Sequence, residues 1–420
     1  MKSFKTKLIA LSLVSSLALV GCNSDSGSDK SKDEGTKDTK TEEQVVLKFA
    51  AQNDNTPATQ ALIDEFNKSN EKYDVEWVEM TNDSAQMHDQ LLNSLSSGSS
   101  EYDVMSLDVV WAGEFAGAGY LEPIDVNMQK AEMNKEDFNS GSMASGNYKG
   151  KQYTLPFFPD LGLLYFRKDI VSSEDAAKLE SGDYTYDDLY AMAEKYTGKD
   201  GTNIGLAYQS KQYEGLTVNL TEFSKSYQDL AGGLETMYKF ATAKFTPKNI
   251  LNYMEGESHV AFEQGKAVFE RNWPYAFGRI KGKEDGVKLA VDQVGIAPLP
   301  NGGAVGGWLL SINKASENAE GAWEFIQFAA GEEGQKIMST TGGYLPGFNS
   351  LLENDEVKAA NEMLGYEGFQ NALKETIARP VSPDYSKVSD TIQVNAHKYL
   401  SSGSGLDEAV SKIEEAVKAE

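Results

Sequence analysis

Cysteine is nearly absent from this chain of 420 residues, which contains only Cys22. One cysteine forms no internal disulfide, so the folded body must be stabilised by its core and its hydrogen bonds, which a chain of this length supports. Histidine is also rare, and His88, His259 and His397 are scattered without the spacing of a metal or catalytic motif. We therefore expect no metal site, no cofactor and no catalytic constellation.

Positive charge is scarce as well. The chain has 39 Lys and Arg against 64 Asp and Glu, a net charge of -25. A nucleic-acid backbone requires clustered Lys and Arg, and no basic stripe with interleaved aromatic residues occurs. Nucleic acid is therefore not an expected partner, and we interpret the acidity as a source of solubility and self-repulsion.

The apolar run at the start of the chain is too short for a membrane-spanning helix. Leu8–Val20 has 13 residues and follows three lysines, whereas a spanning helix needs about 20 apolar residues. This pattern predicts a signal peptide over 1–21. The run ends in Leu19-Val20-Gly21-Cys22, which resembles the lipobox of bacterial lipoproteins, whose cysteine is diacylated and becomes the new N-terminus. The alternative is an ordinary cleavage site with a chance cysteine.

A polar segment follows Cys22. Asn23–Gln44 contains no apolar side chain, and such a composition cannot bury a core. We therefore expect 22–44 to be a lipidated, disordered tether. It would hold a soluble domain at the outer face of the cell membrane, outside the cytoplasm.

The remaining residues, 45–420, are more than one hydrophobic core usually accommodates, so two lobes are expected. The first part alternates strand and helix patterns, with strands predicted at Val45–Ala51, Tyr73–Met80 and Tyr102–Leu107. This order implies parallel strands, and open parallel sheets bind ligands outside their carboxyl ends. One wall of a site is therefore expected at Gln52–Asn55 and Asp108–Trp111.

Six segments occur in an order that resembles a known family: SLDVVWAGEFAGAGYLEPID, LPFFPDLGLLYFRKDI, FEQGKAVFERNWPYAF, IAPLPNGGAVGGWLLSINKAS, TGGYLPGFNSLL and ARPVSPDYSKVSDTIQ. Together they resemble the extracellular solute-binding proteins (family 1) of ABC sugar importers, particularly the maltose- and trehalose-binding group. The resemblance implies a monomeric binding protein that delivers a sugar to membrane permease subunits, and not an enzyme.

The fold implied by this resemblance is α/β, a two-lobed periplasmic-binding-protein-like fold with a hinge and a ligand cleft between the lobes. Mapped onto this sequence, residues 45–155 and 309–375 form one lobe, and residues 156–308 and 376–420 form the other. Pro156, Pro159 and Pro380 support two of these borders because proline interrupts regular structure.

The chemistry of sugar binding suggests which residues matter. A pyranose has apolar C–H faces and a rim of hydroxyls, so its site needs aromatic rings and fixed hydrogen-bonding groups. The resemblance then implies Asp108, Asp160 and Arg379 as hydroxyl partners and Gly307 as a point of close backbone approach. It implies four stacking rings, Phe158, Trp273, Tyr275 and Trp308, and matches Asn53, Asp54 and Tyr344 more loosely.

Each of these residues also has a purely structural interpretation. Asp108 could cap a helix, the tryptophans could belong to the core, and Arg379 could be a solvated hinge charge. Two other functions also stay open: a binding protein for another solute, such as a different oligosaccharide, a peptide or a polyamine, and a glycoside hydrolase that uses Asp108 and Asp160.

The lipobox-like segment makes a direct prediction. Cys22→Ser removes the sulfur that would carry lipid, so the protein should leave the membrane fraction or stay unprocessed, as fractionation and mass spectrometry would show. A variant that is processed and remains anchored like the wild type would contradict lipidation at Cys22.

Overall fold

The computed structural model describes residues 44–418 except 55, 381 and 383. The predicted signal peptide, Cys22 and the predicted tether up to residue 43 lie outside the described residues. Of the helices in the described part, none is long and apolar enough to cross a membrane.

The first part of this body alternates strands and helices as predicted. Strand β1 (Val45–Gln52) pairs in parallel with both β2 (Tyr73–Met80) and β3 (Val104–Asp108), and helices α1 (Ala58–Ser69) and α2 (Ser84–Ser96) connect them. Strand β3 begins two residues later than predicted. Leu62 and Phe66 are four residues apart on α1, so they share a helix face, and they belong to one buried cluster with Leu47 and Phe49 of β1.

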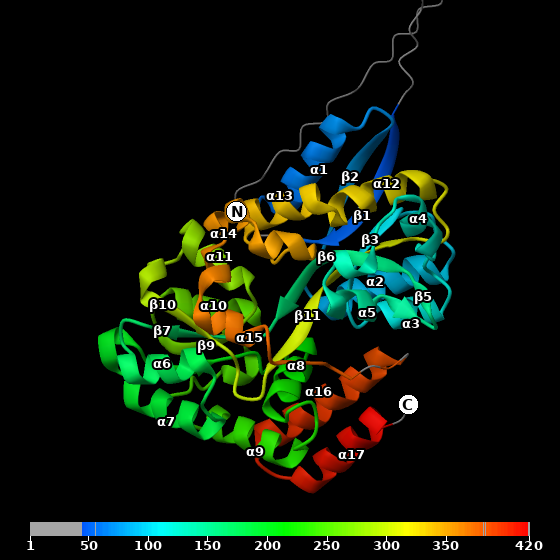
Figure 1. Cartoon of the computed structure of the whole chain (residues 1–420). Coiled ribbons are helices and arrows are strands. Elements are labelled where there is room, and N and C mark those ends of the chain that lie inside the picture. The colour runs from blue at the N-terminus through cyan, green and yellow to red at the C-terminus, as the bar shows by residue number, and fades with distance from the viewer. Residues whose placement is uncertain (1–43, 55, 381, 383, 419–420) are drawn as a thin grey trace, which may run out of the picture. The chain divides into compact units, whose positions relative to one another are not determined.

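Three strands from distant parts of the chain complete this sheet: β6 (Thr154–Leu161), β11 (Gly303–Ile312) and β12 (Thr376–Ile377). The order is β12-β11-β3-β1-β2, and β6 also pairs with β11, side by side with it (Figure 1). Helices α12 (Ala319–Ala330) and α13 (Glu332–Gly342) pack against α1. We call this sheet and its helices the first lobe.

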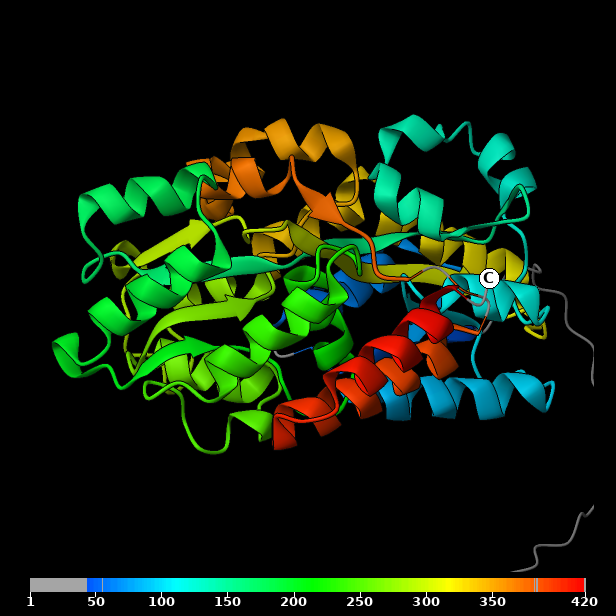
Figure 2. The same ribbon diagram turned by 90° about the horizontal axis from the view of Figure 1, so that it is seen from below.

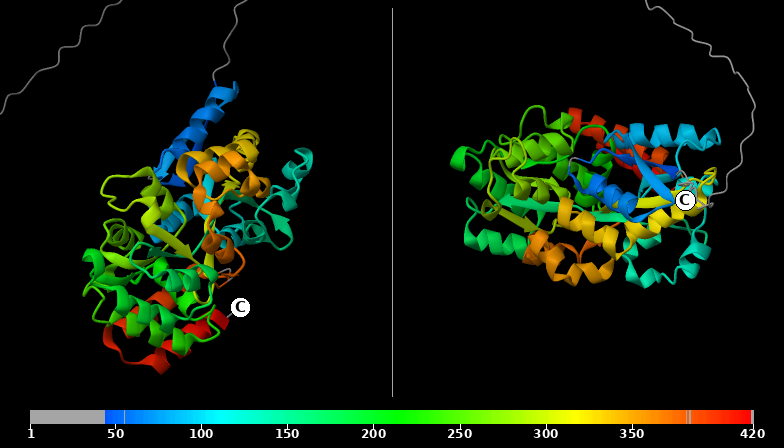
Figure 3. Two further views of the ribbon diagram at one scale, coloured as in Figure 1. Left: turned by 60° about the vertical axis from the view of Figure 1, so that its left-hand side comes forward. Right: turned by 90° about the horizontal axis from the view of Figure 1, so that it is seen from above.

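A second sheet has the order β10-β7-β9-β8. Its strands are β7 (Leu163–Arg167), β8 (Ile204–Ala207), β9 (Ala267–Asn272) and β10 (Val294–Ala297). Its helices are α6 (Ser173–Ser181), α7 (Tyr186–Tyr196), α8 (Glu214–Phe223), α9 (Leu230–Ala241), α10 (Glu255–Glu263) and α11 (Tyr275–Gly282). Their apolar side chains form one large core, and we call this part the second lobe (Figure 3).

The last two helices, α16 (Tyr385–Ser402) and α17 (Leu406–Lys418), run together and pack against α9, and α16 also packs against α8 (Figure 2). Shorter elements complete the fold: α3 (Ala112–Gly117), α4 (Asp125–Lys130), α5 (Ser140–Ser145), β4 (Asn147–Tyr148), β5 (Lys151–Gln152), α14 (Asp355–Ala360) and α15 (Glu367–Ala372). The exact lobe limits stay a prediction. Because α15 packs on α6 and β10, we propose to assign it to the second lobe and not, as predicted, to the first.

Two connections between the lobes touch each other. Strand β6 continues into β7 through Gly162 alone, and β10 leads into β11 through residues 298–302. The Gly162 N–H donates to the Ala304 carbonyl over 3.1 Å. A Cβ atom on Gly303 would lie 2.1 Å from the Gly162 carbonyl oxygen, so the two backbones meet where no side chain fits. We call this point the strand crossing.

Because the backbones touch at the strand crossing, a single methyl group added there should destabilise the protein. Gly303→Ala should lower the free energy of unfolding by about 1 to 3 kcal/mol, because the backbone of residue 162 must move to admit Cβ. Gly113→Ala on α3 is the control, since nothing lies within 4 Å of its Cβ position. Denaturant unfolding of both variants measures the difference. Equal stability of the two would contradict this close contact.

Candidate ligand-binding cleft

A cavity of about 620 Å³ lies between the two lobes. From the first lobe it is lined by residues that follow β1 and β2 and by Asp108 at the end of β3. From the second lobe it is lined by the starts of α8, α10 and α11. The predicted wall at the carboxyl ends of β1 and β3 is therefore present.

Ten of the eleven predicted ligand-binding residues line this cavity: Asn53, Asp108, Phe158, Asp160, Trp273, Tyr275, Gly307, Trp308, Tyr344 and Arg379. Asp54 is not among the lining residues. The structure thus brings together side chains that are up to 326 positions apart in the printed sequence. Their contact with a ligand remains a prediction.

Asp54 has partners within the protein. Its carboxylate accepts from the Thr56 and Thr59 amides over 2.8 and 3.0 Å, and from the hydroxyls of Thr59 and Tyr344 over 2.7 Å each. Burial raises the pKa of Tyr344 well above its usual value, so this hydroxyl stays a donor. Asp54 therefore fixes the loop after β1 and orients the Tyr344 ring, whose centroid is 4.5 Å from that of Phe158.

Arg379 joins both walls of the cleft. Its Nη2 donates to Asp108 Oδ1 over 2.7 Å, and its Nη1 donates to Glu214 Oε1 over 2.9 Å. Glu214 also accepts from Ser389 over 2.6 Å and from the Tyr385 hydroxyl. Arg379 is only 5 % exposed, so it is not a solvated hinge charge. Its Nε is itself buried and has no protein partner among the described residues.

Asp108 has two structural roles already. Besides Arg379, its Oδ1 accepts from the Val110 amide over 3.2 Å, as in an Asx turn. The helix-capping interpretation is wrong, because α3 begins at Ala112 with Trp111 at its N-cap and no side-chain cap. The Asp108 side chain lines the cavity.

Trp273 comes directly after β9, and the charged guanidinium of Arg271 lies against its ring. The guanidinium carbon of Arg271 lies 4.0 Å from the ring centroid, within the range of a cation–π contact. The backbone is also held, because the Trp273 carbonyl accepts from the Tyr165 hydroxyl over 2.9 Å and its amide donates to Asn272 over 2.8 Å. With one face covered by Arg271, the opposite face is the one available to the cavity.

Trp308 lies on β11 between Asp108 of β3 and Phe158 of β6, which pair with it from either side. Its ring meets Trp111 edge-on at 5.4 Å. The neighbouring Gly307 has a φ of +114°, and a Cβ there would lie 2.5 Å from the Phe158 carbonyl oxygen. Glycine is thus required at 307 for the close approach of β6, whether or not a ligand also approaches it.

The carboxyl group of Asp160 has a pKa well above that of an ordinary aspartate. Burial raises its pKa to about 8, with a smaller contribution from the charge of Asp108, while the Leu161 amide and the charge of Arg271 act in the opposite direction. The ligand-free protein therefore holds a proton on Asp160 at neutral pH. A hydroxyl that donates to this carboxylate would favour release of the proton.

Sequence reasoning missed much of the wall from the second lobe. Tyr213, Glu214, Glu255, His259 and Arg279 all line the cavity. The Tyr213 hydroxyl donates to Glu255 over 2.6 Å, and His259 Nε2 lies 2.8 Å from Glu263. The helix starts at 214 and 255 were the available signals, since helix starts at a cleft are frequent ligand sites. Among the described residues, no group of three or more His, Cys, Asp or Glu could hold a metal ion.

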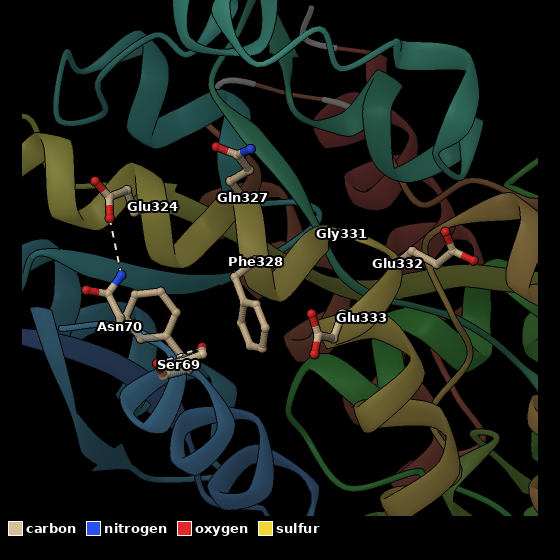
Figure 4. A pocket seen from close by; sticks show the side chains of 9 residues that line it. Ser69, Asn70, Glu324, Gln327, Phe328, Gly331, Glu332 and Glu333 are labelled. Atoms are coloured by element: carbon tan, nitrogen blue, oxygen red, sulfur yellow. Dashed lines mark hydrogen bonds between the residues drawn. The ribbon is translucent and has the colours of Figure 1, made fainter. Parts of the chain in front are cut away.

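A second hollow, of about 400 Å³, lies where the ends of α1 and α12 meet the start of α13 (Figure 4). Phe66 and Phe328 pack at its base, and Asn70 donates to Glu324 over 3.2 Å. None of the predicted site residues lines it. The site of interest is therefore the cleft between the lobes.

The cleft and fold agree with the comparison to known proteins. Residues 50–336 match the family of bacterial extracellular solute-binding proteins. This chain belongs to that family. Extracellular solute-binding proteins bind solutes and are not enzymes, which removes the glycoside hydrolase alternative.

Relatives of this solute-binding protein cover most of its length. A probable ABC transporter-binding protein of Deinococcus radiodurans is 27% identical over 350 residues, 76% of this chain and 80% of the relative. A maltotriose-binding protein of Pyrococcus abyssi is 28% identical over 298 residues, 67% of this chain and 62% of the relative.

Solved structures confirm the predicted two-lobed periplasmic-binding-protein-like α/β fold. The maltose-bound MalE3 of T. maritima superposes with a TM-score of 0.78 at 27% identity, over 89% of this chain and 99% of that one. The GacH receptor of Streptomyces glaucescens superposes with a TM-score of 0.74 at 22% identity, over 90% and 98%, a likeness of fold alone.

Asp160 predicts a pH dependence of stability. Below about pH 4 the carboxyl is protonated in both the folded and the unfolded chain. Between about pH 4 and 8 only the unfolded chain loses the proton, so Asp160 lowers the stability of the wild type by up to about 1.4 kcal/mol per pH unit as the pH rises. Asp160→Asn should therefore gain stability over the wild type across this window and level off above it.

Denaturant unfolding of both proteins at several pH values measures this difference. The window follows from a folded-state pKa of about 8 and an ordinary unfolded value. A stability difference that does not change with pH would contradict the raised pKa of Asp160.

Proposed function

We propose that this chain captures a small neutral sugar in the cleft between its lobes and delivers it to the membrane permease of an ABC importer. The sugar class proposed is an α-linked disaccharide of the maltose or trehalose type. One observation carries the proposal: aromatic rings and paired charged groups from both lobes line a single cavity of about 620 Å³. That volume and composition suit a small polar ligand with apolar faces.

The aromatic surfaces suit the C–H faces of a pyranose. Trp273 and Trp308 are half-buried at the cavity, and Tyr275 and Tyr344 add further rings. Phe158 is nearly fully buried and packs on Tyr344 and Phe157, so it is a support more than a stacking surface.

Hydroxyl partners lie beside these rings. Asp160 offers a carboxyl group that carries a proton at neutral pH, and Asp108 has its Oδ2 unused by donors among the described residues. Both residues line one cavity and supply a donor and an acceptor, as the rim of a sugar requires, and Arg379 holds Asp108 in place.

The charge of the lining favours a neutral ligand over an anionic one. Three basic residues, Arg279, Arg379 and His259, face five acids besides the protonated Asp160: Asp83, Asp108, Glu214, Glu255 and Glu257. All three basic residues already pair with carboxylates of the protein. A sugar phosphate would therefore meet net negative charge without a free cation to bind it. The net negative charge would attract a polyamine, but a polyamine would also meet Arg379 in the lining, which disfavours that alternative.

The names of the relatives support the sugar and the importer. One relative is named a maltotriose-binding protein, one solved structure is described as maltose-bound, and one relative is named an ABC transporter-binding protein. A lipid on Cys22 and a monomeric state complete the proposal, and these two points rest on the sequence alone.

Calorimetry of the purified protein with maltose, trehalose and longer α-glucosides tests the proposal. The wild type should bind at least one of these sugars and should not bind its phosphorylated form. Trp308→Ala and Asp160→Ala should each weaken binding about tenfold to a hundredfold, because stacking area or a hydroxyl partner is lost.

Trp77→Ala is a matched control, because this half-buried tryptophan lies on β2 outside the cavity. It should lose stability without losing affinity. A wild type that ignores every α-glucoside but binds another sugar would contradict the substrate class. Normal affinity in both cleft variants would contradict the site.

A further inference from the structure

A buried ion pair links the Trp273 ring to the strand crossing. Arg271 stacks on the ring, at 4.0 Å from guanidinium carbon to ring centroid. Its Nε donates to Glu222 Oε2 over 2.8 Å and its Nη2 donates to Glu222 Oε1. Arg271 is 2 % exposed and Glu222 is fully buried, so the pair has no contact with solvent.

Glu222 also binds the connection between the lobes. Its Oε1 accepts from the Ala304 amide over 3.0 Å, and Ala304 is the second residue of β11. A Cβ on Gly162 would lie 2.0 Å from the same oxygen and 2.6 Å from Arg271 Nη2. The ion pair therefore occupies the space that glycine leaves open at the strand crossing.

The ring itself reaches the other strand of this crossing. A Cβ on Gly306 of β11 would lie 2.8 Å from the Trp273 ring and 3.5 Å from Asp160 Cβ. Trp273 follows β9 of the second lobe, whereas β11 pairs with the first-lobe sheet. The Trp273 ring therefore contacts β11, the strand that joins the lobes. The Arg271–Glu222 pair supports the ring.

The buried Arg271–Glu222 pair contributes more to the orientation of side chains than to the free energy of unfolding. A buried ion pair often contributes little net stability compared with well-packed apolar residues, because both charges lose their hydration. The pair fixes the orientation of the Arg271 guanidinium, because a planar guanidinium bound through two donors to one carboxylate has little freedom to turn. Gln209 restricts it further, since its Oε1 lies 3.4 Å from Arg271 Nη1 and its Nε2 donates to the Arg271 carbonyl over 3.0 Å.

We propose that Arg271, held by Glu222, is a positioning residue that fixes the Trp273 ring for ligand stacking and couples the ring to the strand crossing. The proposal rests on the proposed sugar-binding function. Arg271 itself touches no ligand, because its guanidinium lies behind the ring and it is not among the residues that line the cavity. Its effect on affinity must therefore pass through Trp273.

A double-mutant cycle on the full chain tests this dependence. Arg271→Lys keeps the charge but loses the planar fork and should weaken maltose or trehalose binding about tenfold, the size of one cation–π or stacking contact. In a Trp273→Ala background the same change should alter affinity less than about twofold, because the ring that Arg271 positions is gone. Equal losses in both backgrounds would overturn the proposal.

Arg167→Lys is the matched control. Arg167 is also a nearly fully buried arginine on the second sheet, bound through two donors to one carboxylate, that of Asp169, but it does not line the cavity. This variant should lose stability and keep its affinity for sugar. If Arg271→Lys does not fold, Glu222→Gln gives the second test, with the same expected dependence on Trp273.

A ligand-free measurement separates failure of this proposal from failure of the proposed function. Arg271→Lys should change the near-ultraviolet circular dichroism of the unliganded protein, and this change should vanish in the Trp273→Ala background. A wild type that binds no sugar but shows this signature contradicts the function and leaves the positioning role supported. A wild type that binds sugar while Arg271→Lys leaves both the spectrum and the affinity unchanged overturns the positioning role alone.

Discussion

The guanidinium of Arg379 connects the two walls of the candidate cleft. It lies in the chain segment between β12 and α16 and bonds one carboxylate at the end of β3 and one at the start of α8. Arginine stays charged even when buried, so it must keep such partners. Asp108 and Glu214 therefore hold the Arg379 side chain between the two walls of the cleft. Its Nε is buried and has no protein partner among the described residues.

A second buried guanidinium, that of Arg271, is also held by a carboxylate. Arg379 meets carboxylates at the surface of the cleft, whereas Arg271 and Glu222 pair at the strand crossing, where glycine leaves space for them. In both cases a buried charge is satisfied by a partner far away in the chain. The two pairs place polar groups and rings at fixed positions before any ligand arrives, which lowers the cost of ordering them on binding.

The sequence predicts the fold class and most of the candidate site, for reasons that can be named. Alternating apolar patterns predict β1, β2 and β3, and Asp108 follows because ligands lie beyond the carboxyl ends of parallel strands. Trp273 and Trp308 could be predicted as site residues because the proline and glycine beside them mark loops at the ends of elements. Glu214 was marked only by its place at a helix start, and no local pattern marks the Glu222–Arg271 pair, whose members are 49 positions apart. Asp54 was matched only loosely, through the family resemblance, and loop composition does not show that Thr56, Thr59 and Tyr344 bond its oxygens.

The central claim is that a sugar bound between the lobes contacts both walls and so favours a closed arrangement of them. Small-angle X-ray scattering of the protein with and without saturating maltose or trehalose tests it most directly. The radius of gyration should be smaller with the sugar than without it. An unchanged radius of gyration under conditions where calorimetry shows full occupancy would contradict the claim, because the sugar would then bind without drawing the two lobes together.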